Sequence, residues 1–251
     1  MQQPRSIQNL LHRAGFDVSR WPRLPGDWVM DSALDAVIRT RNINCVLDVG
    51  GNLGQFGQQI RSYGYKGRIV SFEPSPEALP KLSALARRDA SWEVRPVALG
   101  SESGVAELHL HKGSEFDSLH AGLSDAFLPD SVAHASRLTE VGTATITLST
   151  LAIEYPDAIA GINNPQVLLK SDTQGHDLDV IKGANGLAEP IVAVLVELSA
   201  QAIYEGQPRM TQLIDHLQTE GFAPVAFQPV SRSSDDLRVI EFDGLFMRAI
   251  T

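Results

Sequence analysis

The 251-residue chain has few of the features that mark secreted, membrane or nucleic-acid-binding proteins. It contains one cysteine, Cys45, so it has no disulfide framework and we expect a buried thiol in a reducing compartment. It has no apolar run near the about 20 residues that span a membrane, and no charged-then-apolar leader. It also lacks a basic excess: 21 Lys and Arg against 30 Asp and Glu give a formal net charge of −9, which disfavours nucleic acid or an anionic membrane as partners. These absences predict a soluble cytoplasmic protein.

The length and a hydrophobic content of 43% fit one α/β domain with short additions. We assign residues 1–41 to a helical lead-in and residues 42–251 to the main domain, with an irregular insertion at about 112–142 that suits a substrate lid. The lead-in helices either cover an edge of the sheet, or form a lid or a homodimer contact. Their apolar positions at helical spacing are Ile7, Leu10, Leu11 and Ala14, then Met30, Leu34, Val37 and Ile38.

Apolar runs alternate with helical patterns from Cys45 onward, which predicts an α/β fold with a doubly wound, mostly parallel sheet. The predicted strands are 46–49, 68–73, 92–99, 104–111, 143–148, 167–172, 191–197, 223–227 and 239–247. The predicted helices are 55–63, 178–183 and 210–220, a helix that begins at Pro76 with Ser75 as its N-cap, and a short helix at 131–138.

A glycine-rich turn follows the first strand and is the most informative stretch of the chain. Gly50, Gly51 and Gly54 carry no side chain, so backbone N–H groups there can approach a ligand closely. A helix opens directly after the turn, and its N-terminus favours a carboxylate or phosphate. The next strand ends in an acid, Glu73, where a carboxylate can hold a ribose diol. Together these features predict a nucleoside-binding half-fold.

The nucleoside that fits this pattern best is S-adenosylmethionine. A dinucleotide site usually shows G-x-G-x-x-G, whereas Gly50-Gly51-x-x-Gly54 has a different spacing. Asp48 precedes the first glycine, and its carboxylate would repel a pyrophosphate but attract the ammonium group of a methionine moiety. We therefore predict S-adenosylmethionine as the cofactor, with Asp48 on its ammonium group and Glu73 on its ribose.

The acceptor side is predicted at the other strand ends. In an open parallel sheet the carboxyl ends of the strands share one rim, which here collects Asp48, Glu73, Ala98-Leu99, Asp172 and Glu197. The turn after the strand at 167–172 is dense in polar residues, and His176 within it suits proton removal from a hydroxyl group.

Asp172 is the competing base, or it contacts the methionine end of the cofactor instead. A grouping of Asp172, His176 and Glu197 would also suit a divalent cation, but its spacing resembles no closed metal site, so no metal is predicted.

Further polar residues complete the predicted acceptor and cofactor sites. Ser118, inside the insertion, is placed to hydrogen-bond either cofactor or acceptor, and Tyr204 to stack on a sugar or close the pocket. Gln174 and Asp177 belong to the same polar turn as His176, and Asp177 is expected to cap the helix that follows. Five of the other six histidines, at positions 12, 109, 111, 134 and 216, are expected on surfaces.

These motifs as a set resemble the FkbM family of S-adenosylmethionine-dependent O-methyltransferases. The resemblance runs from about Val46 to Arg248, and its motifs are Asp48-Val49-Gly50-Gly51-Asn52-Leu53-Gly54, Ser71-Phe72-Glu73-Pro74, Ala98-Leu99-Gly100, Leu169-Lys170-Ser171-Asp172-Thr173-Gln174-Gly175, Val196-Glu197-Leu198-Ser199 and Asp243-Gly244-Leu245-Phe246. It implies a class I methyltransferase, Rossmann-like fold with an antiparallel C-terminal strand, and a hydroxyl acceptor on a sugar, glycan or natural product. The expected cofactor residues are Asp48, Gly50, Gly51, Asn52, Gly54, Phe56, Glu73, Pro74, Ala98, Leu99, Ser118 and Asp172, and the expected acceptor residues are Gln174, His176, Asp177, Glu197 and Tyr204.

Three departures from the family pattern stand out. Gly51 replaces a usual alanine, Ser149 a common aspartate and Asp177 a usual glutamate. Two other functions stay open at this stage: a nicotinamide-dependent oxidoreductase, whose phosphate turn should lack Asp48, and a non-catalytic module that keeps only the nucleoside pocket. The polar turns at 172–177 and 197–199 argue against the second, because a pure binder needs no equipped acceptor side.

Overall fold

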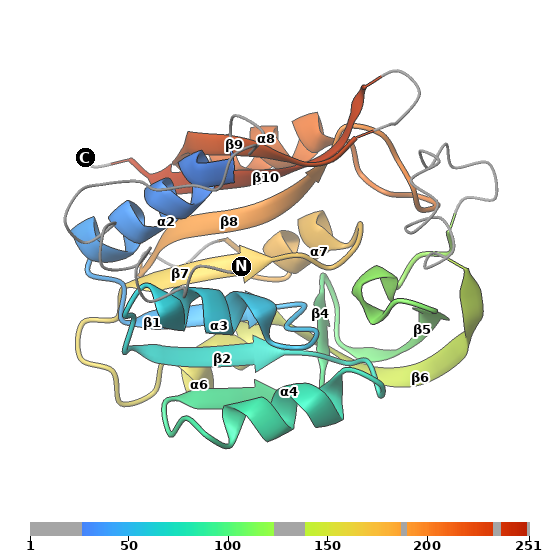
Figure 1. Cartoon of the computed structure of the whole chain (residues 1–251), viewed down its shortest axis with the longest axis horizontal. Coiled ribbons are helices and arrows are strands. Elements are labelled where there is room, and N and C mark those ends of the chain that lie inside the picture. Colours follow the sequence, from blue (N-terminus) through green and yellow to red (C-terminus); the bar gives the residue numbers. More distant parts are fainter. Residues whose placement is uncertain (1–26, 123–138, 187–189, 233–236, 250–251) are drawn as a thin grey trace, which may run out of the picture.

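The computed structural model describes residues 27–122, 139–186, 190–232 and 237–249, which form two sheets with helices around them (Figure 1). The seven-stranded sheet has the spatial order β3 (Trp92–Arg95), β2 (Arg68–Phe72), β1 (Cys45–Val49), β7 (Val167–Ser171), β8 (Ile191–Ser199), β10 (Val239–Arg248) and β9 (Phe222–Arg232). The three-stranded sheet has the order β4 (Ala98–Gly100), β6 (Glu140–Thr150) and β5 (Gly104–His111). The helices are α2 (Asp27–Thr40), α3 (Gln55–Ser62), α4 (Leu79–Ala86), the 3₁₀ helix η1 (Ser114–Phe116), α6 (Leu151–Ala158), α7 (Asp177–Lys182) and α8 (Met210–Thr219).

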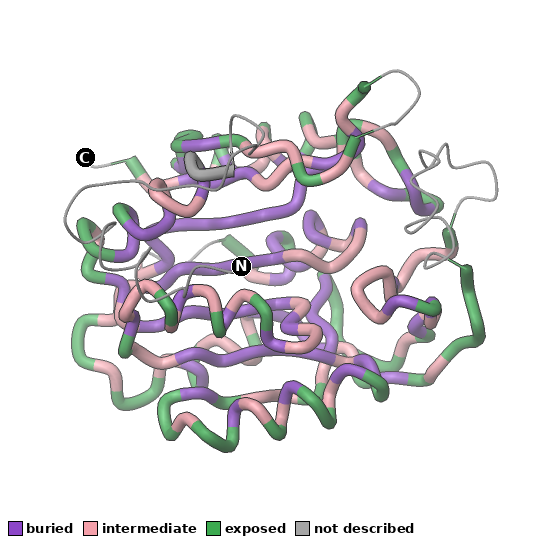
Figure 2. Tube along the Cα trace, viewed as in Figure 1, coloured by how far each residue is buried: buried purple, intermediate pink, exposed green. Residues whose placement is uncertain are grey.

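The main sheet is mostly parallel, as predicted. Strand β1 pairs in parallel with β2 on one side and with β7 on the other, and β8 extends the parallel set beyond β7. Strand β10 runs antiparallel to β8 and to β9, which confirms the antiparallel C-terminal strand. The central strands β1 and β7 are buried along their whole length (Figure 2). Helices cover both faces of a parallel sheet, so the side chains on either face of these strands are buried.

Each face of the sheet has its own hydrophobic core, so the fold is doubly wound. One core contains Ile60 of α3 and Leu82 of α4, together with the α2 residues Met30, Leu34, Val37 and Ile38. The other core contains side chains of α6, α7 and α8. Helix α2 therefore covers the sheet, packing on β9 and β10, as the first of the two interpretations of the lead-in expected. The predicted helical pattern at 7–14 lies outside the described residues, as does the predicted helix at 131–138.

The predicted strand at 92–99 is wrong, because the chain leaves the main sheet in the middle of it. β3 ends at Arg95 and β4 begins at Ala98 in the small sheet, with Pro96, which has no N–H to donate to a ladder, between them. The start predicted for α4 is also wrong. The helix begins at Leu79, and Ser75 is not its N-cap, because the Ser75 hydroxyl donates to Asp117.

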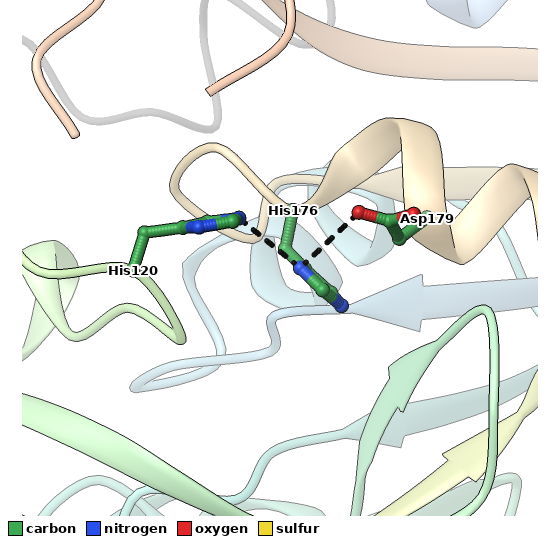
Figure 3. Close-up of side chains that lie close together, drawn as sticks. All are labelled: His120, His176 and Asp179. Atoms are coloured by element: carbon green, nitrogen blue, oxygen red, sulfur yellow. Dashed lines mark hydrogen bonds and ion pairs between the residues drawn. The ribbon is translucent and has the colours of Figure 1, made fainter. Parts of the chain in front are cut away.

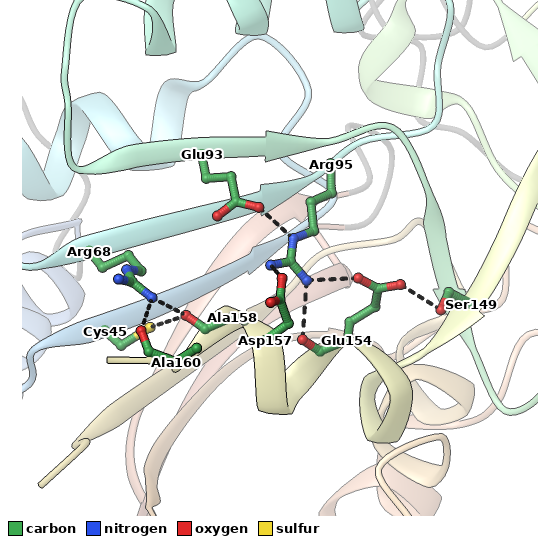
Figure 4. Close-up of polar contacts among 9 residues, drawn as sticks. All are labelled: Cys45, Arg68, Glu93, Arg95, Ser149, Glu154, Asp157, Ala158 and Ala160. Carbon is green, nitrogen blue, oxygen red and sulfur yellow. Dashed lines mark hydrogen bonds and ion pairs between the residues drawn. The ribbon is translucent and has the colours of Figure 1, made fainter. Parts of the chain in front are cut away.

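A network of ion pairs around Arg95 fixes the point where the chain changes sheets (Figure 4). The guanidinium contacts Glu93 on its own strand at 2.7 Å, and Glu154 and Asp157 on α6 at 2.8 and 2.6 Å. Glu154 also accepts a hydrogen bond from the hydroxyl of Ser149, at the end of β6. Ser149, one of the three departures from the family pattern, therefore serves to anchor α6.

No helix among the described residues is long and apolar enough to cross a membrane.

Candidate functional site

A cavity of about 510 Å³ lies beyond the carboxyl ends of β1, β2, β7 and β8, at the edge that Figure 1 shows facing η1 and the small sheet. Ten of the residues predicted for the two sites line it: Gly50, Asn52, Glu73, Pro74, Ala98, Leu99, Asp172, Gln174, His176 and Glu197. Ala98 and Leu99 reach it from β4 rather than from a strand of the main sheet. The predicted residues that do not line it are Asp48, Gly51, Gly54, Phe56, Ser118, Asp177 and Tyr204.

The glycine turn is packed tightly against the neighbouring strands. Gly50 has a φ of +75°, and a Cβ there would lie 1.9 Å from the backbone oxygen of Asp172, so no other residue fits. The N–H groups of Gly50 and Gly51 both donate to the carbonyl of Phe72, at 3.0 and 3.1 Å. These N–H groups therefore hold the turn to β2, and the close approach of the residue after β7 requires a glycine at position 50. We predicted that backbone N–H groups of this turn are available to a ligand. The N–H groups of Gly50 and Gly51 are not available, because both already donate to Phe72.

Glu73 is the carboxylate that lines the cofactor half of the cavity. One of its oxygens accepts the N–H of Asn52 at 2.6 Å and the other accepts the N–H of Ser75 at 2.8 Å, so the backbone orients it. Burial raises the pKa of Glu73 to about 7, against the opposing effects of those two hydrogen bonds and of Lys170. Each carboxylate oxygen keeps a further acceptor position for a hydroxyl group.

Asp48 does not face the cavity, which corrects its predicted direct contact with an ammonium group. The residue has no exposed surface, and its carboxylate accepts a hydrogen bond of 2.8 Å from the hydroxyl of Ser71. The cation beside it is Lys170, whose Nζ lies 3.4 Å from Asp48 Oδ1. A buried charge needs a paired charge, and in this fold the lysine on the neighbouring strand supplies it.

Lys170 is a site residue that the sequence interpretation missed. Its Nζ donates to the carbonyl of Gly50 at 2.8 Å and lies 3.6 Å from Asp172 Oδ2, so it connects the glycine turn to the acceptor side. Burial alone would lower the pKa of Lys170, but Asp172 and Asp48 outweigh burial and raise it. The sequence could have pointed to Lys170, because it is a lysine inside an otherwise apolar run. A lysine in a buried strand requires a charged or polar partner.

Gln174 organises the acceptor side of the cavity. Its amide nitrogen donates to Asp172 and to Glu197, each at 3.1 Å, and its amide oxygen lies 3.0 Å from the hydroxyl of Tyr204. Tyr204 is 1% exposed and also lies within 3.1 Å of the carbonyl of Phe116. The hydroxyl of Tyr204 therefore orients the Gln174 amide. The Tyr204 ring is buried, so it cannot stack on a sugar as predicted.

Ser118 and Asp177 likewise shape the polar turn from outside the cavity. The Ser118 hydroxyl donates to the carbonyl of Gln174 at 2.7 Å. Asp177 accepts hydrogen bonds from the hydroxyl of Ser171 at 2.6 Å and from the N–H of Thr173 at 3.1 Å. Burial raises the pKa of Asp177 to about 6. Asp177 is the first residue of α7 rather than its N-cap, a position that His176 occupies.

Two buried acids line the far wall of the cavity. Burial raises the pKa of Glu197 well above its ordinary value, and Glu241 and Asp172 add to the effect. Glu241, which the sequence interpretation missed, accepts a hydrogen bond of 2.7 Å from Ser231 with one oxygen. Its other oxygen is buried and has no partner among the residues described. The acceptor side therefore combines two buried carboxyl groups with the more exposed Asp172.

The nitrogens of His176 are directed away from the cavity that its side chain lines. Nδ1 lies 3.3 Å from His120 Nε2 and 3.6 Å from a carboxylate oxygen of Asp179. Nε2 is buried and without a hydrogen-bond partner in the described part of the chain, and a Cβ on Gly100 would lie 2.8 Å from it. Burial lowers the pKa of His176. With Nδ1 facing His120 and Asp179 and Nε2 buried beside Gly100, the ring is poorly placed to take a proton from an acceptor in the cavity.

Comparison with known proteins gives one family and several solved structures. The model of the methyltransferase FkbM domain matches residues 48–224. No curated protein matches the chain. A methyltransferase FkbM from Methylobacillus flagellatus KT is 14% identical with a TM-score of 0.46, over 81% of this chain and 44% of that one, so the chain spans less than half the length of that protein.

Two further structures are similar at the same low level. A putative O-methyltransferase from Klebsiella pneumoniae is 11% identical over 99% of this chain and 92% of that one, with a TM-score of 0.49. The fibrillarin of Aeropyrum pernix, solved with S-adenosyl-L-methionine bound, is 10% identical over 88% of this chain and 76% of that one, with a TM-score of 0.43. The assignment to a family therefore rests on the domain model, which covers the carboxyl ends of β1, β2, β7 and β8 that border the cavity but not β10 or most of β9.

Proposed function

The chain belongs to the FkbM methyltransferase family and has a class I methyltransferase, Rossmann-like fold, and from that premise we propose that it is an S-adenosylmethionine-dependent O-methyltransferase. The acceptor is a hydroxyl group of a sugar, glycan or natural product. The observation that carries the proposal is that Glu73 and Asp172, which follow the two strands on either side of β1, line the same cavity. Its volume of about 510 Å³ lies within the roughly 300–1,000 Å³ that small-molecule sites occupy.

The cofactor half of the cavity fits a nucleoside. Glu73, held by two backbone N–H groups, accepts hydrogen bonds from the ribose hydroxyls, and Asn52 and Pro74 line the wall beside it. Gly50 and the residues at the carboxyl end of β7 would hold the methionine moiety. Asp48 serves this half indirectly, because it holds Lys170, which in turn holds the carbonyl of Gly50.

The acceptor half supports Asp172 rather than His176 as the proton acceptor. The Asp172 side chain is 43% exposed and lines the cavity, with Gln174 and Lys170 fixing its orientation. S-adenosylmethionine, when bound, would supply the methyl group to the acceptor oxygen from its sulfonium and leave as the neutral thioether. The Asp172 carboxylate would accept the proton of the acceptor hydroxyl.

Two observations support a small-molecule acceptor. The net charge of −9 disfavours a polyanionic partner, and the acceptor wall combines buried acids with the apolar side chains of Ile203, Val230 and Ile240. A sugar or natural product offers hydroxyl groups to the buried acids and apolar faces to the apolar side chains. Residues of η1, which is outside the parallel core, also line the cavity.

The proposal is tested by methyl transfer and by calorimetry together. Radiolabelled S-adenosylmethionine is incubated with a panel of sugars, glycosides and polyketide-type alcohols, and the binding of S-adenosylhomocysteine and of NADH is measured by calorimetry. We expect S-adenosylhomocysteine to bind and NADH not to bind. Tight NADH binding alone would identify an oxidoreductase, and cofactor binding with no transfer to any hydroxyl compound would identify a non-catalytic module.

The assignment of the base is tested by Asp172→Asn beside His176→Gln. We expect Asp172→Asn to lower kcat by about a hundred- to ten-thousandfold, the usual contribution of a general base, while S-adenosylhomocysteine binds within a few-fold of wild type. His176→Gln should retain far more of kcat. A variant Asp172→Asn with unchanged kcat would show that another group accepts the proton.

A further inference from the structure

Three side chains beside the cavity converge in a way that methyl transfer does not require. His120, from the segment after η1, and His176 and Asp179, from the first turn of α7, point toward one another (Figure 3). One ligand atom from each lies within 4.8 Å of the other two, the only such group of three His, Cys, Asp or Glu side chains found in the described ranges. His120 is 56 residues from His176 in sequence, so the fold brings the group together.

Two of the three distances between ligand atoms are close to those of a tetrahedral metal centre, and the third is within 4.8 Å. Around a zinc ion with ligand bonds of about 2.0–2.1 Å, neighbouring ligand atoms lie roughly 3.3–3.5 Å apart. The observed separations are 3.3 Å from His176 Nδ1 to His120 Nε2 and 3.6 Å from His176 Nδ1 to Asp179 Oδ2. We propose that this chain binds one divalent transition-metal ion of the zinc class through His120, His176 and Asp179.

The surroundings of His120 are those of a metal ligand. A histidine that binds metal through one ring nitrogen usually donates the N–H of the other to a backbone carbonyl, which fixes the tautomer. The ring of His120 is hydrogen-bonded to the backbone of Glu205, and a Cβ on Gly206 would lie 3.9 Å from its Nδ1. Nδ1 thus faces the 205–206 backbone, and Nε2 is left toward His176 and Asp179.

The ligand set also indicates which metal binds. Two neutral imidazoles and one carboxylate suit zinc, cobalt and nickel, whereas magnesium and calcium prefer oxygen ligands alone. Imidazole binds such metals in its neutral form, through a ring nitrogen that carries no proton. The Asp179 side chain is 30% exposed, which leaves a route for the ion and a fourth position for water.

The grouping differs from the one that the sequence suggested. Asp172 and Glu197 are bridged by the amide of Gln174, and His176 is turned away from them toward His120. An ion at the new site would tie the segment that carries His120 to α7, next to the cavity wall that His176 lines. It would also occupy Nδ1 of His176, in agreement with a proton acceptor other than this histidine.

The test uses the full chain without an affinity tag, stripped of metal with a chelator. Cobalt is titrated in and followed by its visible absorption, and zinc is added in competition. We expect one cobalt per chain, displaced by zinc and unaffected by millimolar magnesium. His120→Ala and Asp179→Asn should each weaken binding by at least about 100-fold, because even outer-shell partners of a metal contribute about 10- to 100-fold. The matched control is His109→Ala, whose ring instead pairs with Glu140 at 3.2 Å on the surface of the small sheet and should leave binding unchanged.

Circular dichroism and S-adenosylhomocysteine affinity separate loss of the site from loss of the fold. Asp179→Asn preserves size and lies on a part-exposed turn, so it keeps the test decisive if His120→Ala does not fold. Absence of cobalt binding in the wild-type protein would overturn the proposal, and so would binding that survives both ligand variants. Neither result would affect the proposed methyl transfer, which is read from cofactor binding and product formation.

Discussion

Glu73 makes cofactor binding depend on pH in a direction that the structure fixes. The carboxylate must be ionised to accept two ribose hydroxyls, yet burial gives it a pKa of about 7 in the empty protein. Cofactor binding therefore drives off a proton wherever Glu73 is still protonated. Affinity should rise as pH increases through 7 and level off above it.

The magnitude follows from that pKa. With a pKa of about 7, roughly a tenth of the Glu73 carboxyl groups are ionised at pH 6 and roughly nine tenths at pH 8, so affinity should differ by about tenfold between the two. Glu73→Gln keeps the shape but has no charge to lose. Its affinity should be flat across this range, and at pH 8 weaker than wild type by about 10- to 150-fold, since hydrogen bonds to charged groups contribute about 1.5–3 kcal/mol.

The assay is isothermal titration of S-adenosylhomocysteine at pH 6, 7 and 8. Adenosine and 2′,3′-dideoxyadenosine provide the ligand control, because both lack the amino-acid tail and only the first carries the ribose diol. The pH dependence should appear with adenosine and vanish with the dideoxy compound. An affinity that does not change with pH in the wild type, or a slope that persists in Glu73→Gln, would refute the role given to this carboxylate.

Three other predictions concern the frame of the site. Gly50→Val should abolish cofactor binding by calorimetry, because its Cβ would lie 1.9 Å from a backbone oxygen, whereas Gly104→Ala, with nothing within 4 Å, should bind normally. Lys170→Met should lower the free energy of unfolding in urea by about 3–5 kcal/mol, the cost of an unpaired buried charge, and the double variant with Asp48→Asn should recover part of it. Burial, with help from a neighbouring carboxylate, raises the pKa of Asp243 from 3.8 to about 7, so its protonated form favours the fold. Stability should then fall as pH rises from 5 to 8, and Asp243→Asn should flatten that fall; a stability that increases over this range would contradict the assignment.

The parallel core and its rim could be predicted from the sequence because both depend on local patterns. Continuous apolar runs identify buried parallel strands, and the carboxyl ends of such strands meet at one edge whatever the details of packing. Glu73, Asp172 and Glu197 were placed correctly at that edge by this rule. The break at Pro96 was also predictable, since a proline inside a run argues against one continuous strand.

Glu241 could not be found by the same rule. It lies near the amino end of β10, and that end reaches the cavity only because β10 is antiparallel to its neighbours and pairs Glu241 with Ser199 at the end of β8. A search of carboxyl ends therefore passes over it. The convergence of His120 with His176 is harder still, because it depends on how the segment between β5 and β6 packs beside the start of α7. No spacing within either segment encodes that contact.

The role of Asp48 shows why a correctly recognised motif can still be assigned the wrong contact. Its position before the glycine turn suggested a partner in the ligand, but pairing of β1 with β7 puts it opposite Lys170. The lysine then lies between two carboxylates, 3.4 Å from Asp48 and 3.6 Å from Asp172, while it holds the carbonyl of Gly50. Removing the charge of Asp48 would leave Lys170 to pair with Asp172 alone, which draws the exposed carboxylate away from the acceptor. A substitution that never touches a ligand should therefore alter both the position of the cofactor turn and the basicity of the acceptor side.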